Sequence, residues 1–163
     1  MTLARVVAFR AAGVACAADP ADVERILRPA SLLPAPGSPP WIAGLVAGPR
    51  GLLAVIDVGR RLFPCRESAP PRDLLAGTWD GLPAALGADE VEGILPVEAE
   101  EAPPPEGLAP SVSACLRGVV VAGGERRLLL DVRRLAADEA GAVARAAAGQ
   151  IGSESAERRD QSS

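Results

Sequence analysis

Three carboxylates that lie close together, Asp89, Glu90 and Glu92, are the residues best placed to do chemistry. Paired carboxylates can act as general acid and general base in hydrolysis. On a strand, however, Glu90 and Glu92 share one face while Asp89 points to the other. No aromatic side chain that could stack on a sugar lies nearby in the sequence. The pattern therefore favours a solvated strand face, and a small carboxylate hydrolase remains one alternative function.

Asp57 and Asp131 are two further acidic residues that could act as ligands or nucleophiles. Each immediately precedes a segment that the sequence predicts to be helical. A helix N-cap is often Asp, because its side chain accepts a hydrogen bond from a first-turn backbone N–H. We therefore expect Asp57 and Asp131 to be N-caps rather than catalytic residues.

Several residue types that enzymes depend on are absent from the 163 residues. The chain has no His, the commonest general base and metal ligand, and no Lys, which Schiff-base chemistry requires. Its net charge of −4 argues against a nucleic-acid partner. The widely spaced Cys16, Cys65 and Cys115 form no Cys-x-x-Cys pair, and we expect buried, reduced thiols. The sequence thus predicts a protein without catalytic residues, metal or cofactor.

Short strands separated by Gly- and Pro-containing turns are the elements that must position these residues. No apolar run reaches the ~18 residues of a membrane span, so we expect a cytoplasmic protein without direct membrane insertion. Pro83 places its strand at a sheet edge, because proline cannot donate a ladder hydrogen bond. The predicted strands are Leu3–Arg10, Val14–Ala18, Val23–Arg28, Trp41–Val46, Leu52–Ile56, Leu74–Trp79, Leu82–Leu86, Asp89–Val97, Leu116–Ala122 and Arg126–Leu130.

The sequence predicts few helices, and it predicts that two proline-rich segments are loops. One turn of helix begins at Pro20, a short helix covers Val58–Phe63, and a longer helix follows Asp131 to about Ala148. The predicted loops are Pro29–Pro40 and the acidic Glu98–Pro110.

A short internal repeat relates the two halves of the chain. Arg50-Gly51, an apolar strand and Asp57-Val58 recur as Arg117-Gly118, an apolar hairpin and Asp131-Val132. This favours two related small β-barrels, each closed by a helix. We expect one domain over residues 1–148, with subdomains at about 1–66 and 67–148 that can intertwine, and a disordered tail over 149–163.

The order and spacing of seven segments resemble the CheW family of chemotaxis coupling proteins, over about residues 3–137. Each segment alone is weakly specific, whereas their joint order is strongly specific. They are Val6–Phe9, Asp22–Pro29, Pro36–Val46, Arg50–Val58, Asp89–Leu95, Leu116–Val120 and Leu128–Val132.

The resemblance implies a mainly β fold of two SH3-like five-stranded β-barrel subdomains, with short helices and a C-terminal helix. It implies a non-enzymatic scaffold that joins the cytoplasmic tip of a chemoreceptor to the regulatory domain of a CheA-type histidine kinase at receptor arrays. The family's receptor groove lies between the barrels, near the Arg-Gly motif. This nominates Leu45, Val46, Arg50 and Val91 as partner-binding residues. For Val46 and Val91, an ordinary core position is the alternative.

Two departures from the family pattern single out Arg25 as a fifth candidate. The family usually has Asn and one apolar residue before Arg-Gly, where this chain has Ala47-Gly48-Pro49. The family also tends to have Glu before the isoleucine of the third strand, where this chain has Arg25 and the acid one step earlier, at Glu24. If the family's Glu pairs with the Arg of the Arg-Gly motif, Arg25 and Arg50 would repel each other in this chain, and our hypothesis is that the receptor-facing surface is specialised. The main alternative function is an SH3-like binding module outside chemosensing, whose Pro29–Pro40 loop is itself the ligand.

Overall fold

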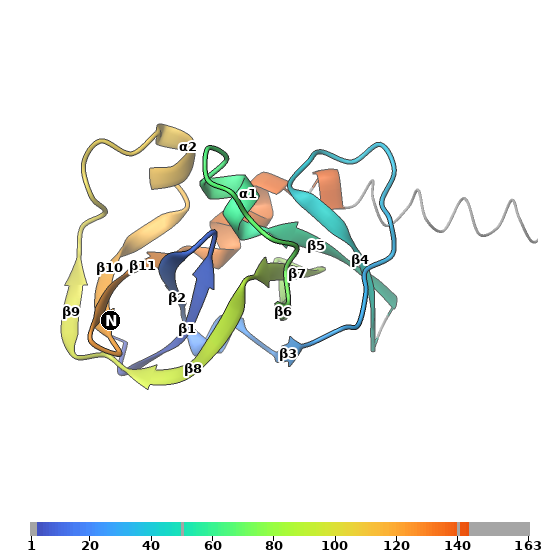
Figure 1. The fold of residues 1–163 in the computed structure, drawn as a ribbon. Helices are drawn as coiled ribbons and strands as arrows, with labels where there is room; N and C mark the ends of the chain where they lie inside the picture. Colours follow the sequence, from blue (N-terminus) through green and yellow to red (C-terminus); the bar gives the residue numbers. More distant parts are fainter. Residues whose placement is uncertain (1–2, 50, 140, 144–163) are drawn as a thin grey trace, which may run out of the picture.

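The computed structural model describes residues 3–49, 51–139 and 141–143, which form two β-sheets with short helices (Figure 1). In spatial order, the six-stranded sheet consists of β8 (Glu90–Pro96), β1 (Arg5–Ala11), β2 (Val14–Ala18), β11 (Glu125–Leu130), β10 (Leu116–Ala122) and β9 (Ala99–Ala102). The five-stranded sheet consists of β3 (Arg25–Leu27), β6 (Asp73–Trp79), β7 (Leu82–Ala88), β5 (Gly51–Asp57) and β4 (Ile42–Gly48). The mainly β prediction is confirmed. Within the described residues neither sheet is closed, so the predicted barrels are not observed as closed.

The helices are short and lie between strands or after the last one. They are η1 (Pro20–Asp22), α1 (Val58–Leu62), α2 (Pro110–Ser113) and the helical residues 132–139 and 141–143. The Asp57 side chain accepts a hydrogen bond of 3.2 Å from the Arg60 N–H, and Asp131 accepts one of 3.0 Å from the Arg134 N–H. Both predicted N-caps are therefore confirmed. Partial burial raises the pKa of the Asp57 carboxyl.

Three hairpins turn through pairs of residues that both have positive φ, as the type I′ turn requires. The pairs are Ala12–Gly13, Asp80–Gly81 and Gly123–Gly124, with φ between 50° and 80°. The Asp89 carboxylate accepts hydrogen bonds from the N–H groups of Ala12 and Gly13, at 3.3 and 2.9 Å. Asp89 thereby supports a turn in which Ala12 has a conformation unfavourable for alanine.

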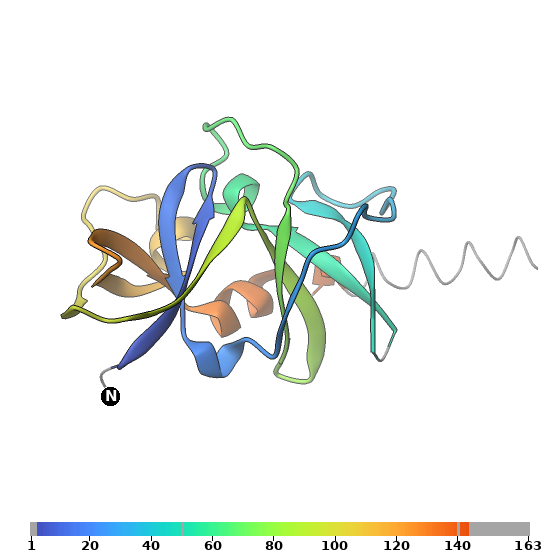
Figure 2. The same ribbon diagram turned by 60° about the horizontal axis from the view of Figure 1, so that its bottom comes forward.

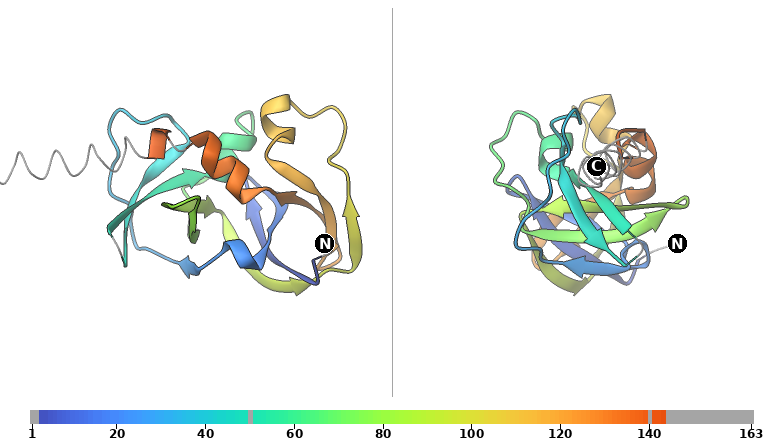
Figure 3. Two further views of the ribbon diagram at one scale, coloured as in Figure 1. Left: turned by 180° about the vertical axis from the view of Figure 1, so that it is seen from behind. Right: turned by 90° about the vertical axis from the view of Figure 1, so that its right-hand side faces the viewer.

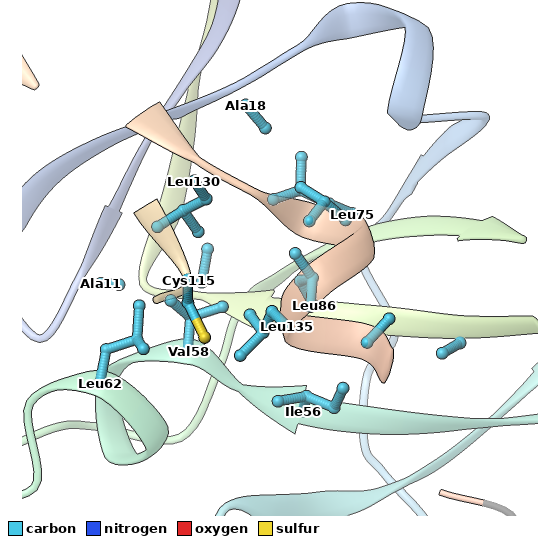
Figure 4. Close-up of a cluster of buried hydrophobic side chains, with 14 of the residues drawn as sticks. Ala11, Ala18, Ile56, Val58, Leu62, Leu75, Leu86, Cys115, Leu130 and Leu135 are labelled. Carbon is cyan, nitrogen blue, oxygen red and sulfur yellow. The ribbon is translucent and has the colours of Figure 1, made fainter. Parts of the chain in front are cut away.

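One large hydrophobic cluster joins the two sheets (Figure 4). It contains Leu130 of one sheet, Leu75, Leu86 and Ile56 of the other, and Leu135 of the helical segment after β11. Figure 3 shows that this helical segment lies across the junction of the sheets. Two smaller clusters belong to one sheet each. The sheets are therefore held together by one shared core.

The two sheets are built from repeated units with the same register. The hairpin β6–β7 repeats β1–β2 at a constant sequence offset, which relates Asp73 to Arg5 and the Asp80–Gly81 turn to Ala12–Gly13. The hairpin β10–β11 repeats β4–β5 at a slightly longer offset, which relates Leu116 to Ile42. In this second pair, both hairpins carry a bulge at the equivalent place, directly after Ile42 and after Leu116. The duplication therefore extends to details of strand pairing.

Each half of the chain contributes its first hairpin to the sheet that the other half completes. β2 pairs in parallel with β11, with Cys16 opposite Leu128, and β7 pairs in parallel with β5, with Ala84 opposite Ala54. Figure 2 shows the β1–β2 hairpin between β8 and the β10–β11 hairpin. Both sheets thus contain strands from each side of residue 66.

Three local predictions are corrected by the structure. The strand with Pro83 is not an edge strand, because β7 lies between β6 and β5. It tolerates the proline because pairing with β5 begins only at Ala84. The predicted loop Glu98–Pro110 begins with an edge strand, β9, which the spare N–H and C=O groups of β10 recruit. Cys65 is exposed, whereas Cys16 and Cys115 are buried free thiols as predicted.

Some predictions fall on residues outside the described part of the chain. These are Arg50, the end of the helix near Ala148 and the tail over 149–163. Among the helices that the structure describes, none has the length and apolar content needed to cross a membrane.

Candidate functional site

The three neighbouring carboxylates are separated by their contacts. Asp89 holds the Ala12–Gly13 turn, Glu92 forms ion pairs with two arginines, and Glu90 is exposed. Among the described residues, no group of three or more Cys, Asp and Glu side chains could hold a metal ion. Asp89 and Glu92 therefore have structural roles rather than the arrangement of a hydrolytic pair.

Glu92 belongs to a charged cluster at one end of the six-stranded sheet, formed by Arg10, Glu92, Glu125 and Arg127. The Arg127 guanidinium donates two hydrogen bonds to the Glu92 carboxylate, at 3.0 and 3.1 Å. It also donates to the backbone oxygen of Ala122 at 3.0 Å. The Arg10 side chain reaches Glu125 at 2.7 Å and Glu92 at 3.4 Å. The cluster joins β1, β8 and β11.

Burial of Arg127 and its hydrogen bonds determine the electrostatics of the charged cluster. The Arg127 side chain is 1% exposed, although it carries a full charge. Such burial is tolerated only when the charge is paired and its N–H groups are bonded. The hydrogen bonds from Arg127 hold the pKa of the Glu92 carboxyl below its ordinary value. The hydrogen bond to Glu125 raises the pKa of Arg10. The charged cluster therefore fills its end of the sheet with side chains that are paired with one another.

The five-stranded sheet has an open groove of about 400 Å³ beside its hairpin turns. Apolar side chains form much of its surface, and two charged residues of opposite sign, Glu24 and Arg25, also line it. The lining residues are Glu24, Arg25, Leu27, Pro49, Leu53, Ala76, Gly77, Thr78 and Pro83.

Backbone contacts position Glu24 and Arg25 at this groove. The Glu24 N–H donates to the Ala76 oxygen at 2.9 Å, which joins the start of β3 to β6. The Trp79 indole N–H donates to the Asp22 oxygen at 2.9 Å. Gly77 permits this close approach, because a Cβ there would lie 2.7 Å from the Asp22 oxygen. The segment that carries Glu24 is thus held against β6.

The groove and the charged cluster occupy equivalent positions in the two sheets. Leu53 faces Val46 across β5 and β4, as Arg127 faces Val120 across β11 and β10. Ala76 and Ala8 hold the same place in the repeated hairpins. Glu24 comes directly before the residue that pairs with Ala76, and Glu92 comes directly before the residue that pairs with Ala8.

Besides Leu53 with Arg127 and Glu24 with Glu92, a third pair of residues is equivalent. Thr78 holds the place in the hairpin β6–β7 that Arg10 holds in the hairpin β1–β2. One sheet thus carries two arginines where the other carries Leu53 and Thr78. The large basic side chains fill the first end, and their smaller counterparts leave the second end open.

The predicted partner-binding residues are only partly brought together. Arg25 is exposed and lines the groove, and Val46 is half-buried and packs beside Leu53. Leu45, on the opposite face of β4, is fully buried in the shared core. Val91 lies in the other sheet, where its N–H donates to Asp73 at 2.7 Å. Arg50 is outside the described residues. The partner-binding role of these five residues remains a prediction.

Sequence reasoning missed Leu53, Thr78 and Pro83 as groove residues. The sequence repeat could have shown that Leu53 is equivalent to Arg127. The two residues are separated by the same number of positions as the hairpins β4–β5 and β10–β11. The repeat was recognised only from its Arg-Gly and Asp landmarks, which do not all align at that offset.

Comparisons with known proteins agree with this architecture. The model of the CheW-like domain family matches residues 5–140. Among solved structures, the scaffolding protein TtCheW from Thermoanaerobacter tengcongensis has the same fold, with a TM-score of 0.67 and 21% identity over 78% of this chain and 84% of that one. The comparison with curated proteins gave no match. The extent of the family match shows that this chain belongs to the CheW-like domain family.

Proposed function

We propose that this chain is a non-enzymatic scaffold that couples the cytoplasmic tip of a chemoreceptor to the regulatory domain of a CheA-type histidine kinase. The observation that carries the proposal is the CheW-like family match over residues 5–140. The fold shared with a scaffolding protein supports it. The use of Asp57, Asp131, Asp89 and Glu92 in caps, a turn and ion pairs is consistent with a protein that binds rather than catalyses. Such a scaffold works in the cytoplasm, at receptor arrays.

The receptor-facing surface is proposed to include Arg25, Val46 and Arg50, and Leu45 and Val91 are proposed to contribute to partner binding. Of these, Arg25 has an exposed side chain on an edge strand, where a partner can reach it. Its positive charge replaces the family's usual Glu, so the surface is specialised for a partner that tolerates or requires that change.

A reconstitution experiment tests the proposal directly. The full chain, a CheA-type kinase regulatory domain and a receptor signalling tip are mixed, and the complex is followed by size-exclusion chromatography. A ternary complex is expected. Binding to neither partner would overturn the proposed function, and binding to one alone would reduce it to a single-partner adaptor.

Charge variants test the specialised surface. Arg25→Glu is expected to strengthen binding to an ordinary receptor tip, because it restores the acid of the family pattern. Arg126→Glu is the matched control, since Arg126 is also exposed and lies on the other sheet. Undiminished binding of an ordinary receptor tip by Arg50→Ala would contradict a specialised surface around the Arg-Gly motif.

A further inference from the structure

Because the two sheets are built from repeated units, the groove can be compared with the equivalent end of the six-stranded sheet. At the equivalent end of the six-stranded sheet, an arginine side chain fills the space, and its guanidinium pairs with Glu92 through two hydrogen bonds of 3.0 and 3.1 Å. The groove retains the acid of that pair, as Glu24, but Leu53 stands where Arg127 would be. Within the described residues, the acceptor is therefore present without the donor that its equivalent has.

Glu24 has no partner for its charge among the residues that the structure describes. Its carboxylate takes part in no ion pair or side-chain hydrogen bond with any residue in the ranges 3–49, 51–139 and 141–143. Its equivalent, Glu92, bonds two arginines. An unpaired carboxylate beside an apolar groove is a favourable acceptor for a partner's cation, because docking removes water from the pair and strengthens it.

We propose that the groove is a docking site for an arginine side chain of a protein partner. The guanidinium pairs with Glu24, as that of Arg127 pairs with Glu92, and the aliphatic stem packs on Leu27, Leu53 and Pro83. This goes beyond the scaffold function, and it does not depend on whether the partner is a receptor, a kinase or another protein.

The geometry favours arginine over lysine, and Arg25 limits the affinity. A planar guanidinium can donate two parallel hydrogen bonds to one carboxylate, which an ammonium group cannot reproduce. Arg25 also lines the groove, so its charge opposes a second cation. The proposal therefore predicts opposite effects of the two neighbouring charges, Glu24 and Arg25.

The test uses N-acetyl-arginine amide as the probe and N-acetyl-citrulline amide as its neutral counterpart of nearly the same shape. Each is titrated into the full chain, and binding is followed by amide NMR shifts. Saturable shifts are expected at Gly77, Thr78 and Leu53 with the arginine probe. Equal shifts with citrulline, or shifts spread evenly over exposed acids, would overturn the proposal.

Single-charge variants show whether Glu24 carries the recognition. Glu24→Gln is expected to weaken probe binding about tenfold, the usual effect of losing a charged hydrogen-bond partner. Arg25→Ala is expected to strengthen it roughly twofold, by removing a like charge. Glu106→Gln, an exposed acid distant in sequence, is the control and is expected to change nothing.

Two results would contradict the proposal even if the probe binds. The first is affinity unchanged by Glu24→Gln. The second is that the arginine probe binds the Arg50→Ala variant but not the unmodified chain. That result would mean that the chain's own arginine, the residue after Pro49, occupies the groove. Binding by the unmodified chain, lost with Glu24→Gln, is the result that supports a partner's arginine.

Discussion

The ends of the two sheets differ although their strands follow the same plan. One end is filled by Arg10, Glu92, Glu125 and Arg127, and the other is open around Glu24 and Leu53. Apart from the additional edge strand β9, the strand order is shared, and so are the bulges after Ile42 and Leu116. At the equivalent positions of the two ends, the difference lies in the side chains: Arg10 and Arg127 in one sheet, Thr78 and Leu53 in the other. A duplicated scaffold can use one copy of a site for stability and leave the other free for a partner.

The largest expected effect is that of Arg127→Leu, which gives the charged cluster the residue found in the groove. The variant should lose about 2–3 kcal/mol of unfolding free energy, because two carboxylates lose their buried cation. Urea unfolding measures the loss. Arg126→Leu, at an exposed neighbouring position, is the control and should change stability by less than about 0.5 kcal/mol. A similar small effect of Arg127→Leu would show that the cluster is not structural.

The pH dependence of stability should also differ between the two ends. The pKa of Glu92 is lowered in the folded state, so its contribution to stability is present above about pH 4.5 and is lost as the pH falls through the folded pKa. The stability difference between the unmodified chain and Glu92→Gln should therefore shrink in acid. Chemical unfolding at several pH values measures this difference, in which effects of other groups, such as Asp57, cancel. A constant difference down to pH 3 would contradict the assignment.

A smaller effect is expected when the groove is filled from within. Leu53→Arg places an arginine opposite Glu24, and its coupling with Glu24→Gln in a double-mutant cycle should be about 0.5–1 kcal/mol. The same Leu53→Arg variant should no longer bind the arginine probe. Zero coupling together with unchanged probe binding would break the equivalence between the two ends.

The smallest effect concerns the two equivalent hairpin turns. Ala12→Gly should stabilise the chain by about 0.5 kcal/mol, because glycine relieves the positive φ of Ala12 at a partly offsetting entropic cost. Asp80→Gly should have almost no effect, since Asp tolerates this conformation better. Thermal unfolding of both variants measures the contrast. Equal effects would show that the Asp89 hydrogen bonds already remove the strain at Ala12.

Much of the local structure was predictable, because its causes are local. The Gly123–Gly124 turn, the hairpin that it joins and the caps at Asp57 and Asp131 depend on residues a few positions apart. The family was identified from the order of its segments. β9 was missed because its sequence, Ala-Glu-Glu-Ala, lacks strand propensity and is followed by prolines, and pairing with β10 overrides that preference.

The candidate site was predictable only in part. Arg25 was identified from a departure in charge, and the structure places it at a groove. Leu45 and Val46 are adjacent in sequence but face opposite sides of β4, so one lies in the shared core and the other beside the groove. Which side of a strand faces the core depends on the sheet that covers it.

The sequence by itself determined the mainly β class, the turns, the helix caps and the family, because each depends on local chemistry or on segment order. The tertiary structure decided which hairpin joins which sheet, since the parallel pairs β2–β11 and β5–β7 join residues far apart in the chain. It also decided that Glu92 is paired, whereas Glu24 has no partner in the ranges 3–49, 51–139 and 141–143. Both are glutamates before an edge-strand residue, and the side chains supplied by other strands distinguish them: Arg10 and Arg127 beside Glu92, but Thr78 and Leu53 beside Glu24.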